Sequence, residues 1–510
     1  MSLFLRRNAP VFYMLLAMFV LYAPWMGRGY VNLEYPFSMA ARGLSDSRFA
    51  GQVDIYLGMQ ANPLGYSIVL AAIYKIFGYH DWFWLAKLPS LCGALMIIVS
   101  GWMLTRDRWQ DRRSLFYFWS SLVTLNPLFV AFATSSTADL LHIGLLMLAI
   151  AIAMESKNDS WAKPFIASII FGLAVITKFI PIYFGLAFIA IAVLDKSKLQ
   201  RTPNHIRRDV AMYVLVPGAI LSFYIWWLYT KYSVVISYGL GPGKPNFFDV
   251  PKFLVTFCKY LVFLGLWCGP VSLLIIVEKF KLRKKLGLGI LLMSVAIFYG
   301  AYLSTIQVDE MDFGGGFPFN INIFRGIQTT GFVIGLSVIS IFLKSIKSDD
   351  RLQKVLLFGI APSLVMISLT LPTQRYIMIV VPAVLILLID ASNLLSVKLR
   401  NLTLAVTALG FALVSFVGMS YLRAQGNASE NMAMWMENNG VIGQSSASPI
   451  LVHAGQHFYG FILSEIKYDV IATSLEGEKL IQERILHREP MNVLGKITRV
   501  YVLRELPKTP

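Results

Sequence analysis

Residues 82–104 read WFWLAKLPSLCGALMIIVSGWML and are followed at 105–113 by TRDRWQDRR. The first stretch exceeds the roughly 20 apolar residues that a helix needs to cross a hydrocarbon core. The second stretch is rich in Arg, which collects with Lys in cytoplasmic loops. An apolar run of this length closed by a basic loop predicts a transmembrane helix that ends on the cytoplasmic side.

The rest of the 510-residue chain has the same character, with 56% hydrophobic and 14% charged residues. Ordinary soluble domains have about 25% charged residues and spread their apolar residues at helix or strand periods. The formal net charge of +17 is therefore attributed to cytoplasmic loops, and no nucleic-acid partner is expected. The fold class predicted is an all-α polytopic membrane protein.

Thirteen transmembrane spans are predicted, and the apolar piece at 64–78 is too short to cross easily, so it is expected to lie along the interface or to re-enter. The predicted spans are 9–27, 82–104, 114–133, 138–154, 164–177, 179–194, 209–229, 252–277, 287–305, 326–343, 354–371, 376–392 and 401–421.

The loop charges predict the topology. One set of loops is basic, and the loops of the other set are poorer in Lys and Arg. The basic loops are 105–113, 196–208, 279–285 and 344–354. The other loops are 28–63, 134–137, 230–251, 306–325 and 372–375. The alternation puts the tail 1–8 in the cytoplasm and the C-terminal end outside. The location expected is the cell inner (plasma) membrane.

Residues 422–510 differ from the membrane module at 9–421. MAMWMENN is typical of an amphipathic helix, and SPILVHA and ITRVYVLREL of short strands. These features predict a small extracytoplasmic α/β domain. Its His453 and His457 are spaced like two metal ligands on a helix, but the segment is typical of strand and loop, so ordinary polar residues are favoured.

Carboxylates at the extracytoplasmic ends of the spans are the first candidates for catalysis. Glu34 and Asp54 lie on the long loop 28–63, and Asp139 begins a span in ATSSTADLLHIGLLML. Loops on a rigid scaffold often carry catalytic groups, and acids in spans usually face a bundle interior or a water-filled cavity. Glu34 and Asp54 could also be solvated, and Asp139 could stabilise a helix N-terminus.

Basic residues on the same side are candidates for binding an anion. Lys178 interrupts an apolar stretch in LAVITKFIPIY, Arg375 stands in LPTQRYIMIVVP, and Arg42 lies in the first loop. Arg offers a fork to phosphate and Lys a point charge. Lys178 and Arg375 could instead be snorkelling membrane anchors.

An acidic cluster leaves a divalent cation open as a cofactor, although no metal ligand is assigned. Asp309, Glu310 and Asp312 precede FGGGFPFNINIF, and hard cations prefer such oxygen ligands. A solvated loop explains the same residues and is preferred.

Six motifs occur in a fixed order over most of 9–393. They are LEYPFSMAARGL, NPLGYSIVLAAIYKIFG, LAKLPSLCGALMII with TRDRWQDRR, LNPLFVAFATSSTADLLHIGLLMLA, FGLAVITKF and QRYIMIVVPAVLILL. In this order they resemble GT-C membrane glycosyltransferases, in particular the superfamily of protein O-mannosyltransferases and the lipid A aminoarabinose transferase.

The resemblance implies transfer of a sugar from a polyprenyl-phosphate donor to a glycan, lipid or protein acceptor on the extracytoplasmic face, with inversion. It implies that a first-loop carboxylate is the general base and that cations hold the departing phosphate. Leu33 stands where the family usually has the Asp of an Asp-Glu pair. Three possibilities follow: Glu34 takes the base role, Asp54 or Asp139 replaces the missing Asp, or the activity of this chain is lost or altered. Ala61-Asn62-Pro63 replaces the Glu-Lys-Pro of the aminoarabinose transferase, which argues against the same donor.

Two other functions are compatible with the sequence. A transporter or flippase of a lipid-linked sugar would favour repeated halves and acids near the middle of the membrane, whereas the unusual charges here lie at the outer rim. A non-catalytic subunit of the same family is kept open by Leu33.

Overall fold

The protein is described by a computed structural model that covers residues 2–29, 34–59, 63–78, 83–155, 161–194, 203–234, 250–269, 271–280, 321–346, 348–369, 374–441, 445–448, 468–473, 478–479, 481 and 484–505. The helices in chain order are α1 (Ser2–Met26), α2 (Glu34–Ser45), α3 (Gly51–Met59), α4 (Gly65–Phe77), α5 (Phe83–Thr105), α6 (Arg113–Thr124), α7 (Pro127–Ala133), α8 (Ala138–Met154), α9 (Ala162–Thr177), α10 (Gly185–Val193), α11 (Pro203–Tyr232), α12 (Val250–Cys268), α13 (Val271–Phe280), α15 (Ile321–Ile346), α16 (Arg351–Ser368), α17 (Gln374–Ile377), α18 (Val381–Ala391) and α19 (Val397–Asn438).

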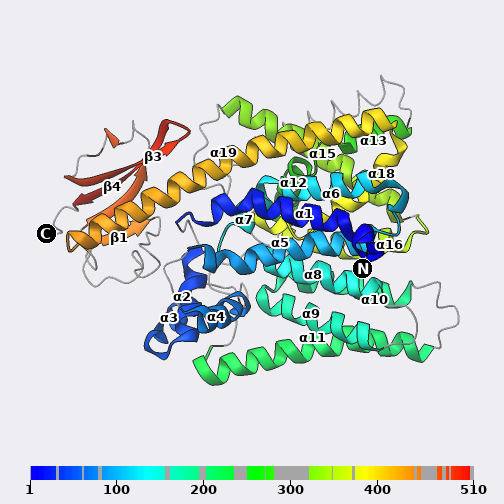
Figure 1. Ribbon diagram of the computed structural model, residues 1–510, viewed down its shortest axis with the longest axis horizontal. Coiled ribbons are helices and arrows are strands. Elements are labelled where there is room, and N and C mark those ends of the chain that lie inside the picture. The colour runs from blue at the N-terminus through cyan, green and yellow to red at the C-terminus, as the bar shows by residue number, and fades with distance from the viewer. Residues whose placement is uncertain are drawn as a thin grey trace.

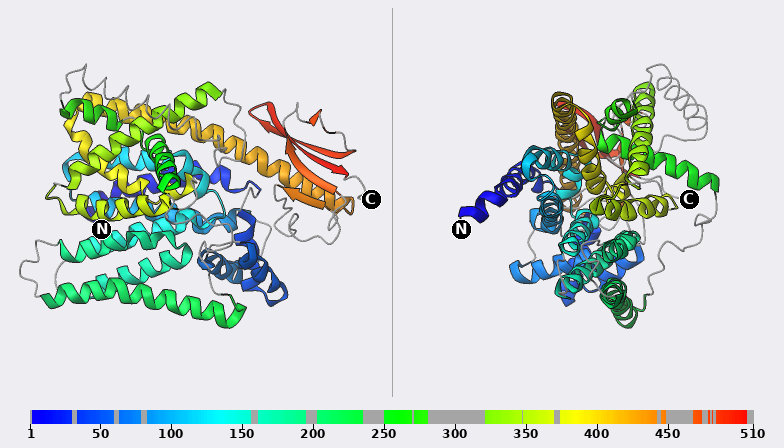
Figure 2. Two further views of the ribbon diagram at one scale, coloured as in Figure 1. Left: turned by 180° about the vertical axis from the view of Figure 1, so that it is seen from behind. Right: turned by 90° about the vertical axis from the view of Figure 1, so that its right-hand side faces the viewer.

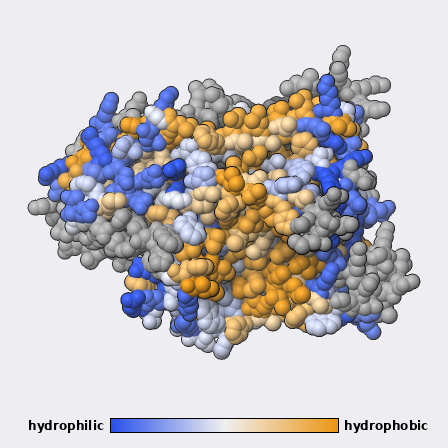
Figure 3. Space-filling view, viewed as in Figure 1, coloured by the Kyte–Doolittle hydropathy of each residue, from blue (hydrophilic) through white to orange (hydrophobic). Residues whose placement is uncertain are grey.

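The helices form a bundle with α19 along one side and α9 and α11 along the other, and the sheet stands at one end (Figure 1). The same arrangement is seen from behind and from the end in Figure 2. An apolar band crosses the middle of the surface between two polar ends (Figure 3). Such a band matches the hydrocarbon layer, because a spanning helix must bury its length in lipid or protein.

The predicted polytopic membrane fold is confirmed. Among the described residues, six helices are long and apolar enough to cross a membrane, or seven if the bent pair α6 and α7 is one span. Shorter apolar helices, among them α4, α8 and α9, complete the bundle. The predicted span 287–305 lies outside the described residues.

The predicted span 114–133 is broken into α6 and α7, which meet at 65°. Asn126 causes the break, because its side chain accepts a hydrogen bond from Leu128 N (3.1 Å) and caps α7, while Pro127 occupies the first turn. Carbonyls freed at such a break need partners in a membrane. Tyr22 of α1 donates to Thr124 O (2.7 Å), and Ser415 of α19 donates to Leu125 O (2.7 Å).

Two predicted helix limits differ in the structure. The run 252–277 is two helices, because α12 ends at Cys268 and Gly269 adopts a φ of 77° that side-chain-bearing residues rarely take. The helix of the last predicted span, 401–421, continues as α19 to Asn438, so MAMWMEN is the end of a 42-residue helix. The fall in hydropathy after 421 therefore does not coincide with the end of the helix.

The C-terminal part contains a four-stranded sheet of order β1-β2-β4-β3. Its strands are β1 (Ser445–Ser448), β2 (Tyr468–Thr473), β3 (Ile485–Val493) and β4 (Lys496–Glu505). β1 pairs parallel with β2, and the other pairs are antiparallel. β4 contains ITRVYVLRE, all but the last residue of the predicted strand ITRVYVLREL, and the sheet lies beside the far end of α19 (Figure 1). Most of the predicted strand SPILVHA lies outside the described residues.

Candidate functional site

A buried ion pair joins Glu34 to Arg28 at the end of the bundle nearest the sheet. Arg28 Nη2 lies 2.5 Å from Glu34 Oε1, and Arg28 Nη1 donates to Glu34 Oε2 at 3.2 Å. Both residues are 2% exposed. Arg28 Nη2 also donates to Ser135 Oγ (2.8 Å). The guanidinium fork therefore fixes the position of the Glu34 carboxylate.

Local features hold this pair in place. Glu34 begins α2, where the helix dipole favours a negative charge. Lys87, fully buried in α5, donates to Met26 O (3.1 Å) and Arg28 O (2.5 Å). The Lys87 ammonium thus satisfies carbonyls that the end of α1 leaves without a helical partner.

Two glycines bring the segment after α1 against α19. A Cβ on Gly29 would lie 2.7 Å from Gly426 O, and a Cβ on Gly426 would lie 2.8 Å from Gly29 O. Real Cβ atoms do not approach backbone so closely, so both positions require glycine. This contact places Arg28 directly beside the long helix.

A second buried ion pair joins Asp139 to Lys178. Asp139 lies in the first turn of α8, and Lys178 follows α9 in an extended conformation. Lys178 Nζ donates to Asp139 Oδ1, and both side chains are 3% exposed. Arg375 and His142 also interact electrostatically with Asp139. The Lys178 ammonium lies 5.0 Å from the ring centroid of Tyr376.

The two ion pairs belong to one polar cluster. Ser135, which contacts Arg28, and Asp139 lie at either end of the turn between α7 and α8. Ser90 of α5 donates to Thr137 O in that turn (2.8 Å) and lies 3.1 Å from the Tyr66 hydroxyl. Tyr66 in turn interacts electrostatically with Glu34. We call these residues, with Arg28, Lys178 and Arg375, the outer cluster.

The described residues of the outer cluster carry charges of both signs. Arg28, Lys178 and Arg375 are cationic, and Glu34 and Asp139 are anionic. Lys87 and Glu430 interact electrostatically. Guanidinium and ammonium groups are the side chains that bind phosphate in proteins.

Two predicted site residues lie outside this cluster. Asp54 is exposed in the first turn of α3 and interacts electrostatically with Tyr232 at the end of α11. The guanidinium of Arg42 stacks on the ring of Phe49 at 3.5 Å. The cluster thus combines the predicted Glu34, Asp139, Lys178 and Arg375 and leaves out Asp54 and Arg42.

Arg28, Lys87 and Ser135 were not predicted as site residues. A lysine inside an apolar span is rare and usually functional or paired, so Lys87 could have been found from the sequence. Arg28 directly follows the first span on the side that is poor in Arg. Ser135 carries no comparable pattern.

Several predicted features cannot be placed. Leu33, Ala61, Asn62, His453, His457 and the acidic cluster of Asp309, Glu310 and Asp312 lie outside the described residues. Within the part of the chain that is described, no group of three or more His, Cys, Asp or Glu side chains could hold a metal ion.

Comparison with known proteins gave matches only among solved structures. No protein-family model and no curated protein matches the chain. ArnT from Cupriavidus metallidurans bound to undecaprenyl phosphate is similar at 14% identity and a TM-score of 0.43, over 97% of this chain and 98% of ArnT. Its apo state matches at 14% identity and a TM-score of 0.42, over 96% of each chain.

An archaeal structure is similar to the same extent. The oligosaccharyltransferase of Archaeoglobus fulgidus, tethered to an acceptor peptide, matches at 14% identity and a TM-score of 0.43, over 85% of this chain and 57% of that protein. ArnT and this oligosaccharyltransferase are GT-C glycosyltransferases, the class that the sequence motifs resemble. With TM-scores below 0.5, the similarity assigns neither residues nor an activity to this chain.

Proposed function

We propose that the protein is an inverting membrane glycosyltransferase that moves a sugar from a polyprenyl-phosphate donor to an acceptor on the extracytoplasmic face. The observation that carries the proposal is the outer cluster, in which the carboxylates of Glu34 and Asp139 are buried against the cations of Arg28 and Lys178 at one end of a membrane bundle. The order of the sequence motifs supports it. Phosphate departure needs fixed cations, and attack by a hydroxyl needs a base within hydrogen-bond reach.

The proposed reaction is a single displacement. The acceptor oxygen attacks the anomeric carbon as the bond from that carbon to the phosphate oxygen breaks, so the configuration inverts. Glu34 takes the proton of the acceptor hydroxyl. Arg28, Lys178 and Arg375 stabilise the negative charge that develops on the departing phosphate.

The pair of Arg28 and Glu34 gives this proposal a further requirement. Both oxygens of the Glu34 carboxylate accept hydrogen bonds from Arg28, so the carboxylate is held away from an acceptor hydroxyl. An arriving phosphate competes with Glu34 for Arg28, since Arg binds phosphate through the same fork. Donor binding would thereby free the Glu34 carboxylate for the acceptor.

The first prediction tests Glu34 against Asp54. Cells without the gene are compared with wild-type cells by profiling of envelope glycans and lipid-linked sugars. Each variant is then expressed in the cells without the gene, and restoration of the missing glycan is measured. Wild type and Asp54→Asn restore the glycan, while Glu34→Gln reduces it at least about a hundredfold, in the range of one general base. Asp139→Asn also reduces it, because the variant removes the ion-pair partner of Lys178. Immunoblotting of membranes controls for the amount of each variant.

The outcomes separate the alternatives. Full complementation by Glu34→Gln removes the base assignment, and if Asp139→Asn also complements, a non-catalytic subunit is favoured. Purified protein in proteoliposomes that moves labelled lipid-linked sugar across the bilayer, without forming a glycosidic bond, indicates a flippase.

A further inference from the structure

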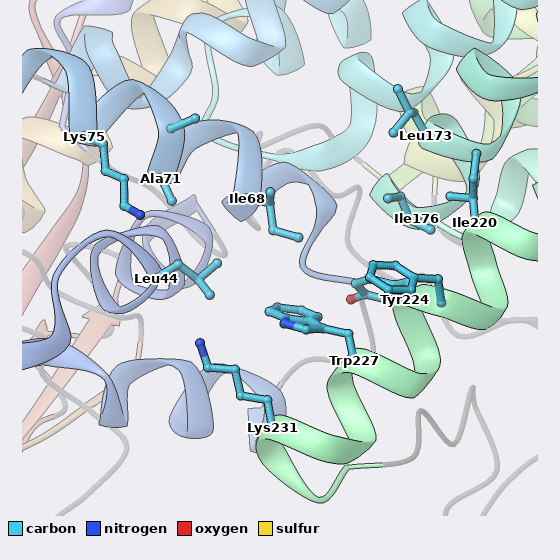
Figure 4. A pocket seen from close by; sticks show the side chains of 12 residues that line it. Leu44, Ile68, Ala71, Lys75, Leu173, Ile176, Ile220, Tyr224, Trp227 and Lys231 are labelled. Atoms are coloured by element: carbon cyan, nitrogen blue, oxygen red, sulfur yellow. The ribbon is translucent and has the colours of Figure 1, made fainter. Parts of the chain in front are cut away.

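A groove of about 710 Å³ lies between α4, α9 and α11, away from the outer cluster (Figure 4). Most of its lining is apolar or aromatic, including Ile68, Leu173, Ile176, Ile220, Tyr224 and Trp227. Its volume is in the range of pockets that hold small ligands. Ile68 and Phe223 are 38% and 65% exposed, so the groove opens on the surface that faces lipid.

Two lysines line one end of this groove. Lys75 in the last turn of α4 and Lys231 in the last turn of α11 come from different walls, and both lie toward Leu44 (Figure 4). Lys231 Nζ lies 5.9 Å from the ring centroid of Trp227 and 5.5 Å from that of Tyr232. Aromatic rings beside a lysine are typical of the membrane interface.

The groove has a charged end and an apolar end, as an amphiphilic lipid does. Eleven residues separate Ile220 from Lys231 on α11, which is about 16 Å along a helix. Lys231 therefore marks the interfacial end of the groove, and Ile220 and Leu173 mark the end that lies deeper in the bilayer. A charged head at the lysines and an apolar chain toward Ile220 fit this gradient.

Helix α4 separates the groove from the outer cluster. Tyr66 points inward and donates to Ala86 O of α5 at 2.8 Å, whereas Ile68 and Lys75 line the groove on the outside. Nine residues along α4 separate Tyr66 from Lys75, or about 14 Å. A phosphate held by Lys75 and Lys231 is thus distinct from a phosphate that reacts beside Glu34.

We propose that the groove is a binding site for an anionic glycerophospholipid of the extracytoplasmic leaflet. The phosphodiester lies between Lys75 and Lys231, and one acyl chain lies along Ile68, Leu173 and Ile220. Asp54 interacts electrostatically with Tyr232 at the same end of the groove. The positive charges of the two lysines are complementary to the negative charge of a phosphodiester. The lipid holds α4 against α9 and α11.

The test measures lipid binding to the full-length protein purified in detergent. Native mass spectrometry and thermal unfolding are recorded with phosphatidylglycerol, phosphatidylcholine, undecaprenyl phosphate and inorganic phosphate. We expect phosphatidylglycerol to bind and to raise the Tm more than the other three. In the double variant Lys75→Gln/Lys231→Gln its affinity falls about tenfold or more, since lysines near the membrane surface attract anionic lipids.

Two variants serve as matched comparisons. Lys398→Gln/Lys496→Gln removes two exposed lysines outside the groove and keeps wild-type binding. Ala72→Phe fills the groove without a change of charge, because Ala72 lines it, and it lowers the affinity for phosphatidylglycerol. This result shows that the acyl chain, as well as the head group, is recognised.

Three results overturn the proposal. Equal stabilisation by phosphatidylcholine and phosphatidylglycerol shows no recognition of charge, and unchanged binding to Lys75→Gln/Lys231→Gln places the lipid elsewhere. Stabilisation by undecaprenyl phosphate alone, lost in the same variant, assigns the groove to a polyprenyl lipid. Each readout is independent of glycosyl transfer, so the proposed function can fail while the lipid site stands.

Discussion

The ion pair between Asp139 and Lys178 shows how individual residues set the energetics of the outer cluster. Removal of one partner from a buried pair leaves an uncompensated charge and costs about 3–5 kcal/mol. Arg375 also interacts with Asp139, so the loss of the Asp139 carboxylate removes an interaction from both Lys178 and Arg375. The two partners are therefore not equivalent.

We predict that Asp139→Asn destabilises the protein more than Lys178→Met, and that the double variant is less destabilised than the sum of the two. Unfolding in detergent, followed by tryptophan fluorescence, measures all three. The interaction energy between the two side chains is the difference between the loss of unfolding free energy in the double variant and the sum of the losses in the two single variants. Additive effects would show that the pair contributes nothing beyond its two desolvated groups.

The third prediction separates Arg28 from Arg42. Lysine keeps the positive charge but cannot reproduce the two parallel bonds from Arg28 to Glu34. Arg28→Lys therefore lowers glycan restoration in complemented cells about tenfold or more, a loss of at least about 1.4 kcal/mol. Arg42→Lys, whose guanidinium stacks on Phe49, stays near wild type. Equal losses in both variants would instead indicate that Arg42 contributes to binding.

Sequence patterns identified part of the site at the residue scale. Glu34, Asp139, Lys178 and Arg375 were predicted because charged residues at the outer rim of a membrane module are unusual. The pairing of Glu34 with Arg28 could not be predicted. Arg28 is held by two contacts that are distant in the sequence: its guanidinium donates to Ser135, and its carbonyl accepts from Lys87.

At the scale of elements, the close contact of α5 and α8 holds the two sides of the cluster together. A Cβ on Gly144 of α8 would lie 2.3 Å from Gly93 O of α5, and a Cβ on Gly93 would lie 2.3 Å from Leu140 O. Small residues permit such close approach of helix backbones in membranes. Ser90 on α5 thereby reaches Thr137 O, just before α8 begins (2.8 Å).

Gly144→Ala is accordingly predicted to separate α5 from α8 and to reduce both stability and glycan restoration. Overpacking of this kind costs about 1–3 kcal/mol. Gly218→Ala on α11 is the matched control, since no atom lies within 4 Å of its added Cβ. Detergent unfolding and the complementation assay report the two effects. A Gly144→Ala protein with the stability and activity of Gly218→Ala would contradict this role.

The breaks between elements show the limit of hydropathy. Both 114–133 and 252–277 are apolar enough to suggest single spans, but Asn126 with Pro127 divides the first and Gly269 divides the second. Asn-Pro is a recognisable turn pattern, so the first break was open to prediction. A lone glycine in an apolar run has many packing roles, and the second break therefore needed the structure.

For the molecule as a whole, loop charges predict which end faces the cytoplasm. Asp107 lies in the basic loop after α5, and Lys496 begins β4 at the other end of the molecule; both are exposed. We predict that a membrane-impermeant maleimide labels Lys496→Cys in intact spheroplasts and labels Asp107→Cys only after permeabilisation. The wild type gives the background from Cys92, Cys258 and Cys268. The reverse pattern would invert the topology and move the outer cluster to the cytoplasmic side.

The length of α19 has a mechanical consequence for the whole molecule. Its 42 residues measure about 63 Å, roughly twice the thickness of the hydrocarbon core. It contains no proline, the commonest cause of a sharp kink. One continuous helix therefore contacts the sheet at its C-terminal end and Gly29 at Gly426. A displacement of the sheet is thereby transmitted along α19 to the residue next to Arg28.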